Sequence, residues 1–87
     1  MDLRGKTILV TGAARRVGRA IALELASAGA RLLVHHSASD SEAAETCEAI
    51  RKLGAQASAF RADLREHSQI LGLFEQIDRQ GPIHALV

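Results

Sequence analysis

Hydrophobic positions in this chain form two kinds of segment that alternate along the sequence. Four short apolar runs, each the length of one buried strand, span residues 6–11, 31–35, 56–61 and 83–87. Three segments with the apolar spacing of a helix cover residues 17–28, the stretch from the serine-rich turn at 37–41 to about Leu53, and the region around 70–77. Strands that alternate with helices in this way predict right-handed crossovers. The expected fold class is therefore α/β, with a doubly wound parallel sheet.

Each predicted helix carries an apolar stripe. In the first helix the stripe consists of Val17, Ile21, Leu25 and Ala28. Gly29 follows as a C-terminal cap, and Gly54 closes the second helix in the same manner. The third helix is marked by Ile70, Phe74 and Ile77. In the second helix Ala43, Cys47 and Ile50 share one face, which predicts a buried thiol in preference to a reactive one.

Composition excludes several classes of function. The net charge of +1 gives no basic field for nucleic acid, and no apolar run approaches the roughly 20 residues of a membrane helix. A single cysteine cannot form an internal disulfide, and residues 1–4 do not resemble a secretory signal, so we expect a cytoplasmic protein. The chain stops inside the fourth apolar run. Residues 1–87 are therefore expected to be the N-terminal half of a Rossmann domain, truncated within that strand.

The segment Thr11–Gly18, between the first strand and the first helix, is typical of a nucleotide-binding turn. Free N–H groups at the start of the helix point toward an anion, and the helix dipole favours negative charge there. Gly18 is followed by Arg19-Ala20, not by Lys and Ser or Thr, which argues against a P-loop. The dinucleotide pattern G-x-G-x-x-G is absent as well, because Ala13 and Ala14 follow Gly12. A cofactor pyrophosphate is the expected ligand.

The turn resembles the T-G-x-x-x-G-x-G motif of the short-chain dehydrogenase/reductase family. Thr11, Gly12 and Gly18 match that motif, whereas Arg16 stands at the place of the middle glycine. This variant resembles pteridine reductases and related dihydropteridine and dihydrofolate reductases, in which such an arginine reaches the cofactor phosphates and the pterin. The alternative is that Arg16 is a solvated loop residue in an ordinary carbonyl reductase.

In a doubly wound sheet the ligand lies at the carboxyl ends of the strands. After the first strand, the predicted phosphate site consists of Gly12, Ala14, Arg15, Arg16, Val17 and Gly18. After the second strand, an NAD enzyme usually carries an acidic residue for the ribose 2′-hydroxyl. This chain instead has Ser37 and Ser39, with Asp40 as the first acid, and Arg15 can approach from the first turn. The pattern predicts NADP as the cofactor.

Several residues of this region have a second interpretation. Ser39 with Glu42 also fits a capping box for the second helix, a role compatible with phosphate binding. His35 and His36 are adjacent in a strand and point to opposite faces, so they cannot share a metal ion, and no metal site is expected. We expect His36 beside the adenosine ribose.

After the third strand, Asp63-Leu64 resembles the Asp-Val or Asp-Leu pair of the family. The resemblance implies that Asp63 accepts a hydrogen bond from the adenine amino group and that Leu64 packs near the base. Asp63 could instead serve as a turn or cap residue.

The family reacts through a Tyr-x-x-x-Lys pair, and this chain has no tyrosine. No catalytic residue is therefore assigned, and the chain alone is expected to be inactive. The resemblance implies a larger NADP-dependent reductase that transfers hydride from NADPH to a carbonyl or imine of a small-molecule substrate, with a pterin or dihydrofolate-like compound indicated by Arg16. General carbonyl or 3-oxoacyl compounds are alternative substrates. A homodimer or homotetramer is also implied. The alternative to an enzyme is a nucleotide-binding or interaction module without catalytic activity.

Overall fold

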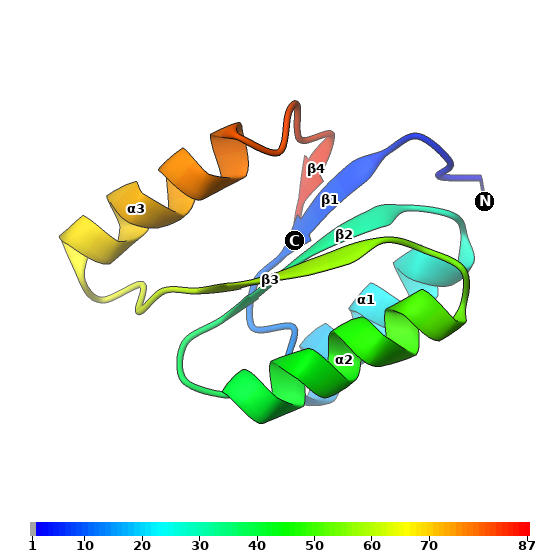
Figure 1. The fold of residues 1–87 in the computed structure, drawn as a ribbon, viewed down its shortest axis with the longest axis horizontal. Coiled ribbons are helices and arrows are strands. Elements are labelled where there is room, and N and C mark those ends of the chain that lie inside the picture. Colours follow the sequence, from blue (N-terminus) through cyan, green and yellow to red (C-terminus); the bar gives the residue numbers. More distant parts are fainter. Residues whose placement is uncertain (1) are drawn as a thin grey trace.

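The computed structural model describes residues 2–87, in which strands and helices alternate strictly (Figure 1). The strands are β1 Thr7–Val10, β2 Arg31–His36, β3 Ala57–Arg61 and β4 Ala85–Leu86. The helices are α1 Arg16–Ser27, α2 Asp40–Lys52 and α3 His67–Asp78. The predicted elements are confirmed in type and order, and β4 is shorter than the predicted run 83–87.

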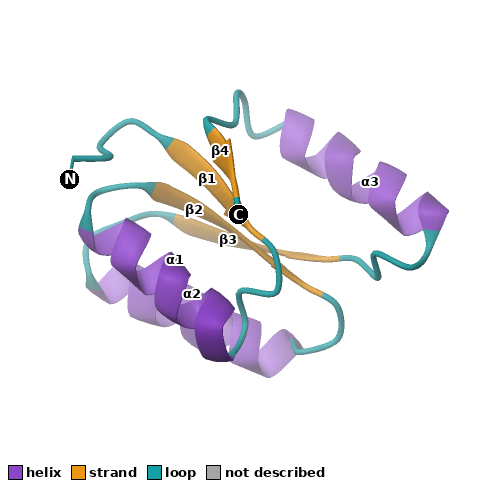
Figure 2. Cartoon of the chain, turned by 180° about the vertical axis from the view of Figure 1, so that it is seen from behind, coloured by secondary structure: helices purple, strands orange, loops and turns teal. Residues whose placement is uncertain are grey.

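The strands form one parallel sheet in the order β3-β2-β1-β4. Helices α1 and α2 cover one face of the sheet and α3 lies on the other (Figures 1 and 2). The connections from β1 to α1, β2 to α2 and β3 to α3 all leave the sheet at the same end. This arrangement confirms the predicted half of a doubly wound fold, and it brings three strand-to-helix turns to one edge.

β2 lies between β1 and β3, and its side chains pack on both faces because helices cover both faces of the sheet. Leu32 and Val34 join the core under α1 and α2, whereas Leu33 joins the core under α3. All three are fully buried. A strand that is covered on both sides has no solvent-facing positions at its centre, which explains why Leu32, Leu33 and Val34 form an unbroken apolar run.

The apolar face of α2 is confirmed, because Ala43, Cys47 and Ile50 are all buried. Burial raises the pKa of the Cys47 thiol, which keeps the sulfur protonated and unreactive at neutral pH. Gly29 and Gly54 have positive φ angles after α1 and α2, as expected of C-terminal caps.

The predicted stripe of α1 is wrong in part. Val17 is 71% exposed, and Ile21 and Leu25 are only partly buried. The buried residues of the helix are Ala22 and Ala26, whose small side chains let the helix axis approach the sheet closely. In α3 the buried residues are Leu73 and Ile77. Phe74 is half exposed because it follows Leu73 directly and therefore points to a different side of the helix. No helix among residues 2–87 is long and apolar enough to cross a bilayer.

Candidate functional site

The turn after β1 is fixed by backbone and side-chain hydrogen bonds to β2 and to the residue that follows β4. The N–H and the hydroxyl of Thr11 both donate to the carbonyl of Val87, at 2.9 and 3.0 Å. The N–H of Gly12 donates to Nδ1 of His35 at 3.2 Å, and the N–H of Ala13 donates to the carbonyl of His35 at 2.9 Å. The first three N–H groups of the turn therefore point into the fold, which sets the direction of the residues that follow.

Gly12 and Gly18 are required by different features of the same turn. Gly12 has a φ of +62°, a conformation that glycine adopts without strain. Gly18 has an ordinary φ, but a Cβ placed on it would collide with the carbonyl oxygen of Gly12. The missing side chain of Gly18 therefore allows the first turn of α1 to pack against the end of β1.

The N-terminus of α1 has the features that suit an anion. Arg15 is the N-cap and makes no side-chain capping bond, so the N–H groups of the first turn stay available. Arg16 has a φ of +55°, the only positive φ of a non-glycine residue among residues 2–87, and both Arg16 and Val17 are exposed. N–H groups, helix dipole and an adjacent guanidinium together suit a phosphate.

Helix α2 supports the turn from the other side, through two contacts. The buried hydroxyl of Thr46 donates to the carbonyl of Ala14 at 3.0 Å. Nε of Arg15 lies 3.5 Å from Oε2 of Glu42. Sequence reasoning missed Thr46, although a threonine beside Ala43 and Cys47 on a buried helix face is a signal of a polar contact.

The end of β2 carries the two serines that are predicted to bind the ribose phosphate. Ser39 is the N-cap of α2, as predicted, but its side chain makes no capping bond. The predicted capping box with Glu42 is therefore wrong, because Glu42 is drawn to Arg15. Ser37 is exposed and Ser39 is partly exposed, so neither serine hydroxyl is enclosed in the core.

Arg61, at the end of β3, contacts the candidate site, and sequence reasoning missed it. Its Nη1 donates to Oδ2 of Asp40 at 3.2 Å, and its Nε donates to the carbonyl of Ser37 at 3.1 Å. Asp40 is the first carboxylate after β2 and the one that could compete with a 2′-phosphate. Its ion pair with Arg61 balances that negative charge.

His36 is the last residue of β2, and its side chain is buried, with 6% exposed. Nδ1 is 3.6 Å from Oδ1 of Asp40, too far for a hydrogen bond, and no described residue forms a hydrogen bond with it. Burial lowers the pKa of His36, and the carboxylate of Asp40 partly opposes that shift. The neutral ring therefore adds no charge at neutral pH.

Asp63 and Leu64 follow β3 at the same edge of the sheet. The carboxylate of Asp63 accepts hydrogen bonds from the backbone N–H, Nε and Nη2 of Arg65, which hold the pKa of Asp63 below its usual value. The N–H of Asp63 donates to Oε1 of Gln69 at 2.7 Å. Leu64 is 44% exposed and free to contact a ligand.

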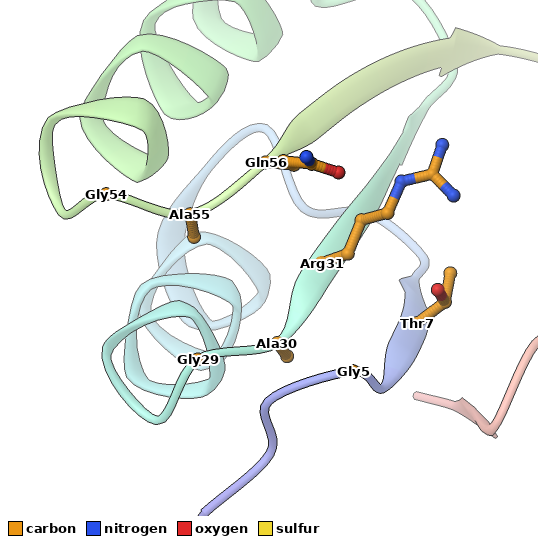
Figure 3. Close-up of a pocket in the computed structure, with 8 residues that line it drawn as sticks. All are labelled: Gly5, Thr7, Gly29, Ala30, Arg31, Gly54, Ala55 and Gln56. Atoms are coloured by element: carbon orange, nitrogen blue, oxygen red, sulfur yellow. The ribbon is translucent and has the colours of Figure 1, made fainter.

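A hollow of about 360 Å³ lies at the opposite edge, where β1 and β2 begin (Figure 3). It is lined by Gly5, Thr7, Gly29, Ala30, Arg31, Gly54, Ala55 and Gln56. Its one charged side chain, Arg31, is already bonded to the carbonyl and side-chain oxygens of Gln80. The predicted site residues all lie at the other edge, so this hollow is not the candidate site.

The chain is similar to known proteins of one family. The family model described as short chain dehydrogenase matches residues 6–87. A trihydroxynaphthalene reductase of Pestalotiopsis fici is 43% identical over 75 residues, which make up 86% of this chain and 27% of that relative. A short-chain dehydrogenase/reductase homolog of Bacillus subtilis is 40% identical over an alignment of 88 positions, covering 100% of this chain and 81% of the relative.

Two solved structures share the fold closely. Landomycin C-6 ketoreductase LanV with bound NADP and rabelomycin has a TM-score of 0.86 and 44% identity, over 91% of this chain and 32% of the other. A dehydrogenase from Burkholderia cenocepacia with bound NADP has a TM-score of 0.90 and 35% identity, over 98% of this chain and 34% of the other. The chain therefore spans about a third of these structures and about a quarter of the fungal reductase.

Proposed function

Because the chain belongs to the short-chain dehydrogenase family, we propose that it is the part of an NADP-dependent ketoreductase that holds the adenosine and phosphate groups of the cofactor. The observation that carries this proposal is the turn after β1. Its first three N–H groups are bonded inward, and the uncapped start of α1 and Arg16 face outward. An anion is the ligand that such a surface attracts.

The choice of NADP over NAD rests on the end of β2. Ser37 and Ser39 follow the strand, and the carboxylate of Asp40 is paired with Arg61 at 3.2 Å. Two hydroxyls and a nearby guanidinium offer donors to a 2′-phosphate, whereas an NAD enzyme needs a free carboxylate for the 2′-hydroxyl. NADP is bound in two of the related structures.

The proposed reaction is reduction of a carbonyl group, for which bound NADPH supplies the hydride. The residues of this chain bind and orient the cofactor, and Asp63 and Leu64 are proposed to contact the adenine. The chain has no tyrosine, so the proton donor of the family's chemistry must come from other residues. The dimer or tetramer that the family resemblance implies remains a prediction.

A ketone is favoured as substrate because the relatives include hydroxynaphthalene reductases and a ketoreductase. A pterin or dihydrofolate-like substrate is the second candidate and rests on Arg16 alone. Arg16 is exposed at the edge of the sheet where the cofactor is proposed to bind. Turnover of NADPH with an aromatic ketone and with dihydrobiopterin, by a protein in which these residues are joined to the missing proton donor, separates the two. We expect turnover with the ketone, and turnover with the pterin only would reverse the assignment.

The competing hypothesis is a nucleotide-binding or interaction module without catalysis. The sequence that encodes residues after Val87 separates it from the enzyme. An Asn-rich turn followed by a distant Tyr-x-x-x-Lys is expected for the reductase. A stop codon directly after Val87 would favour the module.

A further inference from the structure

His35 occupies a central position among the three strand-to-helix turns. It lies near the end of β2, the strand between β1 and β3, and its side chain is 4% exposed. Nδ1 accepts the N–H of Gly12 at 3.2 Å, and Nε2 lies 2.9 Å from the carbonyl of Ala62. One imidazole therefore joins the turn after β1 to the residue that precedes Asp63.

These two contacts define the state of the ring. The N–H of Gly12 is a donor, so Nδ1 must be the unprotonated acceptor, and the single proton lies on Nε2, which donates to Ala62. A neutral ring in this tautomer satisfies both neighbours. The opposite tautomer would place two donors against each other at Gly12 and two acceptors against each other at Ala62.

The contacts of His35 fix the orientation of two successive peptide groups, at Gly12 and at Ala13. The carbonyl of Gly12 lies where a side chain of Gly18 would be, so the orientation of Gly12 determines how α1 approaches β1. The carbonyl of His35 accepts the N–H of Ala13 at 2.9 Å and fixes the next peptide too. A shift at His35 would therefore move the start of α1, where the phosphates are proposed to bind.

We propose that His35 is a positioning residue for the cofactor, with Nδ1 orienting the phosphate turn and Nε2 anchoring the ring to the carbonyl of Ala62. This inference rests on the proposed function, since it concerns the same cofactor. The side chain is buried and cannot touch the cofactor itself, so its effect must pass through Gly12 and Ala62.

Two substitutions separate the two ring nitrogens. In His35→Asn, the side-chain oxygen can take the place of Nδ1 and accept from Gly12, but the side chain is too short to reach Ala62. In His35→Gln, the longer amide can donate to Ala62 in place of Nε2 and leaves Gly12 without an acceptor. Each variant loses one of the two hydrogen bonds, so we expect similar decreases in melting temperature.

The two variants should differ in NADPH affinity, measured by fluorescence titration of the protein that carries this sequence. We expect His35→Asn to bind within about threefold of the parent and His35→Gln to bind at least tenfold more weakly, a loss of about 1.4 kcal/mol. Ile50→Val is the control for general destabilisation, because Ile50 is buried near the C-terminal end of α2, on the side of the sheet where β3 begins and away from the turns. It should lower the melting temperature and leave affinity unchanged.

Equal affinities for His35→Asn and His35→Gln would overturn the inference while leaving the proposed function intact. A parent protein that does not bind NADPH would overturn both. Should a variant not fold, ¹⁵N spectra of the parent imidazole provide the test. We expect His35 in the tautomer with the proton on Nε2, and a proton on Nδ1 would overturn the inference.

Discussion

The carbonyl oxygen of Gly12 occupies the place where Gly18 would carry a side chain. Gly18 is therefore fixed by contact with backbone, which cannot move aside as a flexible side chain could. We predict that Gly18→Ala lowers the free energy of unfolding by about 1–3 kcal/mol through overpacking, and that it impairs NADPH binding by displacing α1.

Gly72 provides the matched control for that substitution. It lies inside α3 with an ordinary φ, and a Cβ placed on it would meet no neighbouring atom within 4 Å. Gly72→Ala should raise the free energy of unfolding by up to about 1 kcal/mol, since alanine is the better helix former. Chemical denaturation measures both variants, and equal stability of the two would contradict the proposed close approach.

Arg16 combines a positive φ with a proposed phosphate contact. Arg16→Gly and Arg16→Ala both remove the guanidinium, and only glycine relieves the left-handed backbone. We predict that both variants bind NADPH at least tenfold more weakly, given about 1.5–3 kcal/mol for a charged hydrogen bond. Arg16→Gly should be about 1 kcal/mol more stable than Arg16→Ala. Lys52→Ala, at the far end of α2, is the control for net charge, and an equal loss of affinity there would remove Arg16 from the site.

His36 should make stability depend on pH. Its pKa in the folded protein lies below 6.5 because the ring is buried. The unfolded chain therefore binds more protons as the pH falls through 6.5 toward the folded pKa, and the free energy of unfolding should decrease over that window. The Asp40 carboxylate opposes the shift, so Asp40→Asn should lower the pKa further. Proton NMR titration of the imidazole measures both values, and a pKa above 6.5 in the parent would contradict this account.

Asp63 is predicted to bind adenine, which NADPH and NADH share. Asp63→Ala should weaken both cofactors equally, by the roughly 0.5–1.5 kcal/mol of one hydrogen bond. Arg65→Ala, which removes the two guanidinium contacts to the carboxylate and keeps the backbone N–H contact, is the companion variant. Isothermal titration with both cofactors provides the comparison. Unchanged affinity in Asp63→Ala, with the fold intact, would return Asp63 to the role of a turn residue.

The fold could be predicted because strand and helix periods, glycine caps and the position of the turn are local features of the sequence. The edge that carries the candidate site followed from the parallel order of the strands. Side-chain partners could not be predicted in the same way. His35 with Gly12, Thr46 with Ala14, and Arg61 with Asp40 are between 21 and 32 residues apart, so only the packed fold brings them together.

The two incorrect predictions, the capping box at Ser39 and the apolar stripe of α1, have the same cause. Ser39 and Glu42 have the spacing of a capping box, but Arg15 from the preceding turn competes for the carboxylate. The predicted stripe of α1 follows its larger apolar residues, whereas Ala22 and Ala26 are the ones that approach the sheet. Local pattern identified each helix correctly, and tertiary packing decided which face is buried.

We propose that the edge formed by the ends of β1, β2 and β3 binds NADP in preference to NAD. The decisive measurement is the pair of dissociation constants for NADPH and NADH, obtained for the protein that carries this sequence and for its Ser37→Asp variant. We predict roughly ten- to a hundredfold tighter binding of NADPH, from about 1.5–3 kcal/mol of charged contacts to the 2′-phosphate, and a smaller preference at high salt and in the variant. Equal affinities in the parent, or tighter binding of NADH, would contradict the claim.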